Sequence, residues 1–330
     1  MSGPWNLLAH DWAARLLQGQ LANGHLRHAY LFTGPVGVGR RTLALRLAQA
    51  LNCAHPPTSG EFCGDCRACR GFSNLQHADL FVVERQEGDR EIKVDAVREL
   101  CRALSRTPLE ARFQVALLLN FEQASEEAAN ALLKTLEEPS PTVLLCLTAA
   151  DVDSLPETIV SRCEVIRLRP APSSQLAGAL GAHLRIEPQP AALLASLSGG
   201  RPGQALTLHS QPEILEQRNE WLDACQHLLS AKRVERFAFA DQASKDRERL
   251  RSLLLVWLSF WRDVLLQSAR SSASSANPDR EEQLSALAQK MNPQTVRCWV
   301  SAIEHTLELL RTNVNARLAM EVLLLDLPNL

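Results

Sequence analysis

The amino-acid sequence predicts an α/β P-loop module with a parallel sheet, followed by a small helical lid and an all-α C-terminal domain. Short apolar stretches alternate with helical patterns in the first half of the chain, which favours a parallel sheet covered on both faces. A glycine-rich turn, GPVGVGRRT, lies between the first apolar stretch and a helix. Beyond Pro170-Ala171-Pro172 every remaining pattern is helical.

The elements of the α/β module follow from apolar periodicity and from residues that start or stop helices. Strands are predicted at 29–32, 80–83, 115–119, 143–147 and 164–168. Helices are predicted at 5–21, 43–51, 96–104 and 125–137. The first helix has Leu8, Trp12 and Leu16 at helical spacing. Asp95 is the expected N-cap of the third helix, and Pro139 closes the fourth.

Three domains are predicted from these patterns. They are the P-loop-like domain at 1–168 with a cysteine-rich insertion at 53–72, a helical lid at 169–209, and a helical domain at 210–330. Ser268–Pro278 is expected to be a flexible loop, and Asn315–Leu325 a strongly apolar helix. Trp257, Trp261 and Trp299 are expected in the core of the last domain.

Composition narrows the class of protein. The 330 residues are 46% apolar and 22% charged, as in an ordinary soluble globular protein. The net charge of -2 argues against a free-standing nucleic-acid binder, which would carry a basic excess. The beginning of the sequence does not have the pattern of a signal peptide, and no membrane contact is expected. Nine cysteines without secretory signals indicate a reducing cytoplasm, with metal binding as the use of any cluster.

The glycine-rich turn is a P-loop in which the two chemically active positions are changed. The pattern G-x-x-x-x-G-K-[ST] requires a lysine for phosphates and a hydroxyl for Mg²⁺. Here Arg40 replaces the lysine, and Arg41 replaces the serine or threonine. The candidate residues for holding a phosphate are Gly34, Gly37, Gly39 and Arg40. Nucleotide binding therefore stays open, hydrolysis is not expected, and a glycine turn without any ligand is the alternative.

The acidic element that an ATPase needs is also altered. Such an enzyme ends its central strand with a carboxylate pair that holds Mg²⁺ and polarises water. In this sequence the strand VALLL runs into Asn120-Phe121, and the first carboxylate, Glu122, comes too late. Because two separate catalytic elements are changed together, we expect a protein that works beside an ATPase.

Four of the cysteines have the spacing of a metal site. Cys53, Cys63, Cys66 and Cys69 form C-x₉-C-x₂-C-x₂-C, which suits tetrahedral Zn²⁺ in a closed structural site. His55 and His77 are competing ligands nearby, and a redox pair is the alternative use of the thiols. The other cysteines are expected to be ordinary buried thiols: Cys101, Cys146, Cys163, Cys225 and Cys298.

Five stretches resemble one protein family. They are Arg27–Gly34 (RHAYLFTG), Ile92–Leu100 (IKVDAVREL), Ala128–Pro139 (AANALLKTLEEP), Leu155–Cys163 (LPETIVSRC) and Asn313–Pro328 (NVNARLAMEVLLLDLP). The sequence resembles bacterial clamp-loader subunits of the AAA+ superfamily over essentially its whole length. Within that group, the altered nucleotide site resembles that of the delta-prime subunits of DNA polymerase III.

The resemblance implies roles for several positions. It aligns Leu119 and Asn120 with the acidic pair of the active ATPases, and it places a polar sensor near Thr148-Ala149-Ala150. It implies the same four cysteine ligands for zinc, and a C-terminal domain that assembles into a collar. Arg201, after Gly199-Gly200, is a candidate for a second sensor.

Arg162 has a separate role by the same resemblance. Pro156 suits the first turn of a short helix, so Arg162 falls at the end of this helix, before the last predicted strand. From the residues alone, a surface arginine in a local ion pair is the expected reading. In clamp loaders, however, the arginine of the SRC motif is an arginine finger that reaches the ATP bound by the neighbouring subunit.

The resemblance implies a non-hydrolysing clamp-loader subunit in the cytoplasm. Its expected partners are gamma or tau ATPase subunits, the delta subunit and, through the complex, the sliding clamp and primer-template DNA. Polymerase activity would belong to the holoenzyme, and no intrinsic catalysis is expected. The alternatives are a competent clamp-loader ATPase of the gamma or tau type, and a zinc-dependent nucleic-acid-binding module.

Overall fold

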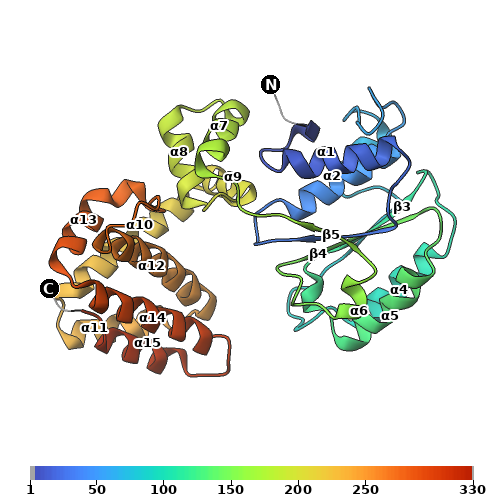
Figure 1. Cartoon of the computed structure of the whole chain (residues 1–330). Helices are drawn as coiled ribbons and strands as arrows, with labels where there is room; N and C mark the ends of the chain where they lie inside the picture. Colours follow the sequence, from blue (N-terminus) through green and yellow to red (C-terminus); the bar gives the residue numbers. More distant parts are fainter. Residues whose placement is uncertain (1–3, 329–330) are drawn as a thin grey trace. The chain divides into compact units, whose positions relative to one another are not determined.

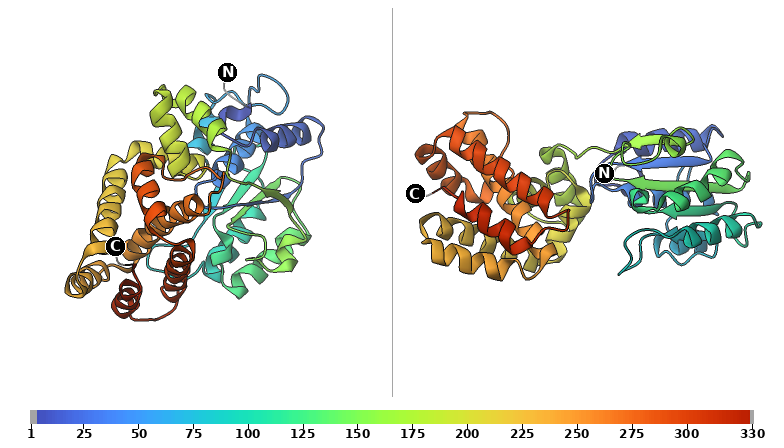
Figure 2. Two further views of the ribbon diagram at one scale, coloured as in Figure 1. Left: turned by 60° about the vertical axis from the view of Figure 1, so that its left-hand side comes forward. Right: turned by 90° about the horizontal axis from the view of Figure 1, so that it is seen from below.

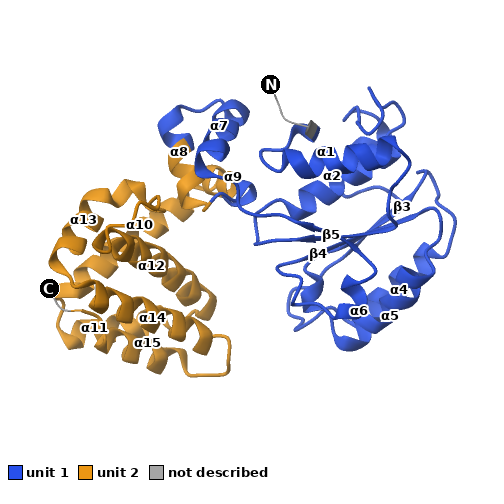
Figure 3. Ribbon diagram, viewed as in Figure 1, with its two compact units in different colours: residues 1–191, 200–204 blue, residues 192–199, 205–330 orange. Residues whose placement is uncertain are grey.

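The structure is a computed structural model that describes residues 4–328 (Figures 1 and 2). The chain forms two compact units, which Figure 3 distinguishes by colour. The first contains the residues up to Ala191 together with Gly200–Gln204, and the second contains Ala192–Gly199 and the residues from Ala205 onward. The predicted domain boundaries near 168 and 209 stay a prediction.

A parallel sheet forms the centre of the first unit, with its five strands in the order β2-β3-β4-β1-β5. The strands are β1 (Ala29–Thr33), β2 (Leu80–Val83), β3 (Gln114–Leu118), β4 (Val143–Ala149) and β5 (Glu164–Arg167). Each lies where the apolar stretches of the sequence predict a strand. The predicted α/β class with a parallel sheet is therefore confirmed.

Helices cover both faces of this sheet (Figure 1). They are α1 (Asp11–Ala22), α2 (Arg40–Asn52), α3 (Arg67–Ser73), α4 (Val94–Leu104), α5 (Glu126–Glu137) and α6 (Glu157–Val160). In β1, Tyr30 and Phe32 join the core formed with α1 and α2, whereas Ala29 and Leu31 join the core formed with α4 and α5. This follows from the alternation of side chains along a strand. Since both faces are covered, the strands read as unbroken apolar runs.

The first helix differs from its prediction. It begins at Asp11, not at residue 5, and the chain before it forms the short 3-10 helix η1 (Pro4–Asn6). Trp12 and Leu16 are 52% and 42% exposed, so they do not form the packed face. The buried residues of α1 are Ala13, Ala14 and Leu17.

The N-cap predicted for the third helix was also wrong. Helix α4 has Lys93 at its N-cap, and Asp95 lies in its first turn. A carboxylate there is still favourable, because the N-terminal turn of a helix attracts negative charge. The cap of α5 is Ser125, whose side chain accepts a hydrogen bond from the N–H of Ala128.

The remaining elements are helical, as predicted. The α-helices are α7 (Ser173–Leu184), α8 (Pro188–Leu197), α9 (Pro202–Ser210), α10 (Pro212–Ser230), α11 (Arg233–Ala243), α12 (Arg247–Ser268), α13 (Glu281–Lys290), α14 (Pro293–Leu309) and α15 (Ala316–Leu325). Two 3-10 helices, η2 (Phe121–Gln123) and η3 (Pro278–Arg280), lie in connections. Trp257, Trp261 and Trp299 are buried in the core of the second unit, which confirms their predicted position. Within residues 4–328, no helix combines the length and apolar character that a membrane span requires.

Candidate functional site

The P-loop lies between β1 and α2 and depends on the conformational freedom of its glycines. Gly34, Gly37 and Gly39 have φ angles of 142°, 82° and 112°, which side chains with a Cβ rarely adopt. A Cβ on Gly34 would lie 2.2 Å from the carbonyl oxygen of Leu168, so no larger residue fits there. The strand, turn and helix that this motif requires are therefore present.

The start of α9 contacts this loop. The N–H of Gly203 donates to the carbonyl oxygen of Gly37 at 2.8 Å, and a Cβ on Gly203 would lie 2.9 Å from the same oxygen. Arg201 lies two residues earlier, and burial lowers the pKa of its guanidinium. Gly203 thus allows α9 to pack closely against the loop, while the role of Arg201 as a second sensor stays a prediction.

Arg40, at the lysine position of the P-loop, is turned inward. It is 7% exposed, and its Nη2 donates to Oδ1 of Asn120 at 2.9 Å. Its Nη1 is buried and has no hydrogen-bond partner within residues 4–328. Burial lowers the pKa of Arg40, and the charge of Glu122 acts in the opposite direction. Arg41, at the hydroxyl position, is exposed to solvent.

Asn120 is itself held by the end of β4. It adopts a left-handed conformation with φ 49° and ψ 54°, and its N–H donates to Oγ1 of Thr148 at 2.8 Å. Glu122 accepts a hydrogen bond from the N–H of Ala150 at 3.3 Å. The segment after β3 is therefore bonded to the end of β4 through these two backbone N–H groups, and the side chain of Asn120 bonds to Arg40.

Arg162 and the P-loop lie at opposite ends of the parallel strands. Strands β1 and β5 are adjacent and parallel, with Tyr30 opposite Glu164. The P-loop follows the carboxyl end of β1, whereas Arg162 precedes the amino end of β5. A strand of five residues spans about 16 Å at roughly 3.3 Å per residue. Arg162 is therefore remote from the P-loop of its own chain.

The Arg162 side chain is held by its own subunit. Nη2 lies 2.6 Å from Oε1 of Glu137, and Nη1 donates to the carbonyl oxygen of Thr158 at 2.9 Å and to Oγ of Ser161 at 3.3 Å. The side chains of Arg162 and Glu137 are 35% and 50% exposed. The local ion pair expected from the residues alone is thus present.

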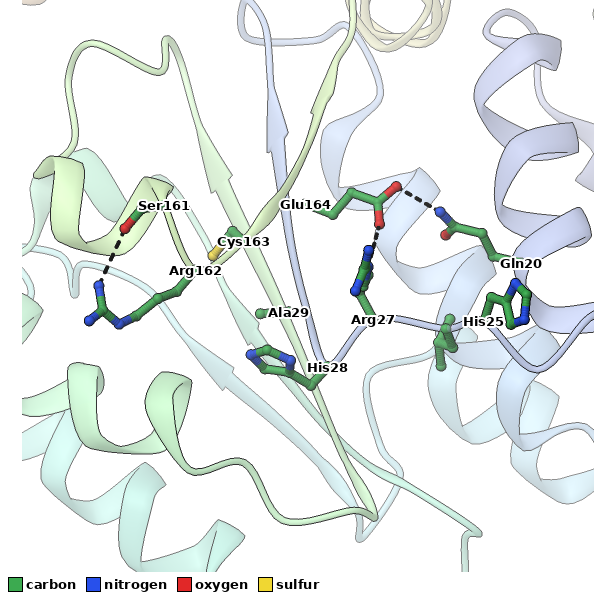
Figure 4. A pocket seen from close by; sticks show the side chains of 10 residues that line it. Gln20, His25, Arg27, His28, Ala29, Ser161, Arg162, Cys163 and Glu164 are labelled. Carbon is green, nitrogen blue, oxygen red and sulfur yellow. Dashed lines mark hydrogen bonds and ion pairs between the residues drawn. The ribbon is translucent and has the colours of Figure 1, made fainter.

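A cavity of about 750 Å³ opens beside Arg162 at the amino ends of β1 and β5 (Figure 4). Its lining includes His25, Arg27 and His28, which precede β1. On its far side, Arg27 lies 3.6 Å from Glu164, and Glu164 accepts a hydrogen bond from Gln20 at 2.6 Å. The sequence drew attention to Arg162 here, but not to Arg27 or Glu137, although both lie in the quoted motifs.

The four cysteines of the insertion meet at one point, and their sulfur atoms lie within 4.8 Å of one another. Sγ of Cys63 is 3.6 Å from that of Cys53 and 4.0 Å from that of Cys69. Tetrahedral zinc with bonds of about 2.3 Å would hold its sulfurs about 3.8 Å apart, so the cluster fits this ion. Although burial raises the pKa of Cys66, hydrogen bonds from Cys69, Ala54 and nearby thiols lower it to about 6.

His55 and His77 do not belong to this cluster. The ring of His77 stacks on Phe72 with centroids 4.4 Å apart, and its Nδ1 accepts from the N–H of Asp79 at 3.0 Å. Among the other cysteines, Cys146 and Cys225 are buried as predicted. The prediction is wrong for Cys298, which is exposed, and Cys101 and Cys163 are only half-buried.

Comparison with known proteins identifies the family. A family model described as "DNA polymerase III, delta subunit" matches residues 9–172. The DNA polymerase III subunit delta' of Pseudomonas aeruginosa is 40% identical over 206 residues, which are 61% of this chain and 61% of that protein. The subunit delta' of Bacillus subtilis is 28% identical over 316 residues, covering 95% of this chain and 94% of its own length. The chain belongs to the delta-prime family of DNA polymerase III subunits.

The overall fold of this delta-prime chain is also found in a solved structure. A DNA polymerase III gamma subunit-related protein from Thermotoga maritima matches with a TM-score of 0.51, covering 95% of this chain and 97% of the other. Its sequence identity of 16% makes this a likeness of fold alone. The alignment with the Pseudomonas relative leaves more than a third of both proteins unmatched, since it spans 61% of each.

Proposed function

We propose that this delta-prime chain is a clamp-loader subunit that does not hydrolyse ATP and that supplies Arg162 to ATP bound by a neighbouring subunit. The position of Arg162 carries the proposal. Because Arg162 precedes β5 while the P-loop follows β1, its guanidinium serves a nucleotide of another chain more readily than one of its own.

A guanidinium in this position would act by electrostatics. As a phosphoryl group is transferred, negative charge spreads over its oxygens, and a well-placed cation stabilises that charge. Arginine fingers contribute roughly 10³–10⁵ to the rate in well-studied GTPases. Arginine suits this role because its charge is permanent and its planar fork matches phosphate oxygens.

The chain's own nucleotide site has different properties. Arg40 bonds to Asn120, which supplies a neutral amide where the active ATPases have a carboxylate. Arg41 supplies no hydroxyl for Mg²⁺. With neither a Mg²⁺ ligand at these positions nor a lysine, we expect no hydrolysis by this chain, although weak nucleotide binding stays open.

The partners follow from the family and from this geometry. An arginine finger at the amino ends of the strands and a P-loop at their carboxyl ends suit a head-to-tail contact between subunits, as in a ring. The neighbours would be gamma or tau ATPases and the delta subunit, and the C-terminal helices would join a collar. The complex would load the sliding clamp onto primed DNA, and polymerase activity would belong to the holoenzyme.

Zinc would have a structural role in this subunit. Cys53, Cys63, Cys66 and Cys69 would complete its tetrahedral shell and leave no position for a substrate. The metal would fold the insertion between α2 and α3, which has few apolar residues of its own. The four thiolates would supply the negative charge and the tetrahedral arrangement that Zn²⁺ requires.

Kinetics of the assembled complex test the proposal. Arg162→Ala is expected to lower DNA-stimulated ATP hydrolysis at least tenfold at the neighbouring site, with little recovery in Arg162→Lys. Arg169→Ala is the matched control, because Arg169 is exposed and follows the other end of β5. An unchanged rate in Arg162→Ala would refute the role of Arg162 as an arginine finger. Mg²⁺-dependent ATP hydrolysis by the isolated chain, at the rate of active clamp-loader ATPases, would favour the alternative of a competent ATPase of the gamma or tau type.

A further inference from the structure

We propose that Glu137 is a positioning residue that holds Arg162 in an inactive position until a neighbour's phosphate replaces its carboxylate. This rests on the proposed function of Arg162. Glu137 is the last residue of α5, and Arg162 lies two residues beyond the end of α6. The pair therefore joins the helix that precedes β4 to the helix that follows it. It lies on the side of the amino ends of the strands, which is proposed to face the neighbouring subunit.

The contact between Glu137 and Arg162 is short and charged. Nη2 of Arg162 lies 2.6 Å from Oε1 of Glu137. A charge-assisted hydrogen bond of this length neutralises much of the field that the guanidinium would exert on a phosphate. Arg162 cannot stabilise a transition state fully while this carboxylate remains its partner.

The other contacts of Arg162 keep its side chain close to its own subunit. Nη1 donates to the carbonyl oxygen of Thr158 and to Oγ of Ser161. These acceptors are neutral, so they can remain in place or be exchanged for water at small cost. Glu137 is the partner whose charge competes directly with phosphate.

The pair is exposed enough to be exchanged. The side chains are 35% and 50% exposed, so solvent and a neighbouring subunit can reach them. Exposed ion pairs are weak, and the strength of a typical one corresponds to at most about a fivefold change in an equilibrium. A phosphate chain with several negative charges can therefore displace the carboxylate, whereas water alone does so only in part.

Chemical modification of the isolated chain tests the contact without any partner. Phenylglyoxal modification of Arg162, measured by peptide mass spectrometry, is expected to be about two- to fivefold faster in Glu137→Gln than in the original chain. Glu138→Gln is the control, since Glu138 is an adjacent exposed carboxylate that forms no ion pair within residues 4–328. Equal rates in all three proteins would overturn the proposal.

Kinetics of the assembled complex test the consequence. Glu137→Gln is expected to raise kcat/KM for DNA-stimulated ATP hydrolysis about two- to fivefold, and to have no effect in the Arg162→Ala background. A lower kcat in Glu137→Gln would show that the carboxylate supports the active position, which would overturn the proposal. If Arg162→Ala itself left the rate unchanged, the proposed finger would fail, while the modification experiment would still report whether Glu137 holds Arg162.

Discussion

Nη2 of Arg40 donates to Oδ1 of Asn120 at 2.9 Å, which joins the two altered positions of the nucleotide site. The P-loop lysine of an active ATPase faces the phosphates, and the acidic pair at the end of the central strand holds Mg²⁺. Here the corresponding side chains bond to each other. The changes in the two motifs, which are 80 residues apart, are thus parts of one contact.

This contact predicts an asymmetry in stability between its two partners. Asn120→Ala is expected to lower the free energy of unfolding by about 1–3 kcal/mol, because it leaves a buried guanidinium without its acceptor. Arg40→Met is expected to change it by less than about 1 kcal/mol or to raise it, since the buried charge is removed together with an unpaired Nη1. Urea unfolding measures both, with the exposed Arg41→Met as the control. A larger loss in Arg40→Met would contradict this account.

Partial repair of the P-loop should increase nucleotide affinity. Arg40→Lys combined with Arg41→Thr restores the G-K-T sequence and frees Asn120 from the arginine. We expect at least a tenfold tighter Kd for an ATP analogue with Mg²⁺, which corresponds to about 1.4 kcal/mol. Isothermal titration measures it, and omission of Mg²⁺ should remove much of the gain. Hydrolysis is not expected to return, because Asn120 is no carboxylate.

Metal content tests the cysteine cluster. The purified chain is expected to hold one zinc ion, and Cys66→Ser is expected to lose it, because three thiolates leave the tetrahedral shell incomplete. Zinc release with a colorimetric chelator and hydrogen exchange in residues 53–72 measure the loss of metal and of local order. Cys298→Ser is the control, since Cys298 is exposed and lies outside the cluster. Equal zinc in both variants would refute the site.

Asp79 predicts a pH-dependent contribution to stability. Its carboxylate is buried and accepts N–H groups of Leu109, Glu110 and Ala111 at 2.8 Å each. Burial raises its pKa, but these hydrogen bonds outweigh burial and hold it below the usual 3.8. The stabilisation is therefore present above pH 3.8 and is lost as the pH falls through the lower, folded-state value.

Asp79→Asn removes this effect. We expect the variant to be less stable by about 1–3 kcal/mol at pH 7, because an amide accepts fewer of these hydrogen bonds. The difference from the original chain should shrink when unfolding is measured below pH 3.8. A difference that is constant from pH 7 to pH 3 would mean that the charge of Asp79 does not contribute.

Much of the fold was predictable because its signals are local. The apolar runs of β1 and β4 lie inside the sheet, and the glycines of the P-loop have the positive φ angles that their motif requires. The start of α1 was not predictable in this way. Trp12 and Leu16 have helical spacing, yet Ala13, Ala14 and Leu17 form the packed face, because the tertiary packing of α1 in the core decides which of its faces is buried.

The sequence by itself determined the residue types and spacings: the altered P-loop, the four cysteines, the SRC motif and the strands between them. The tertiary structure decided which distant residues meet. It placed Arg40 on Asn120, Arg162 on Glu137, and Arg162 across the sheet from the P-loop. The reason is physical: periodicity and motif spacing depend on neighbours along the chain, whereas strand order and side-chain packing bring together residues that no local pattern connects.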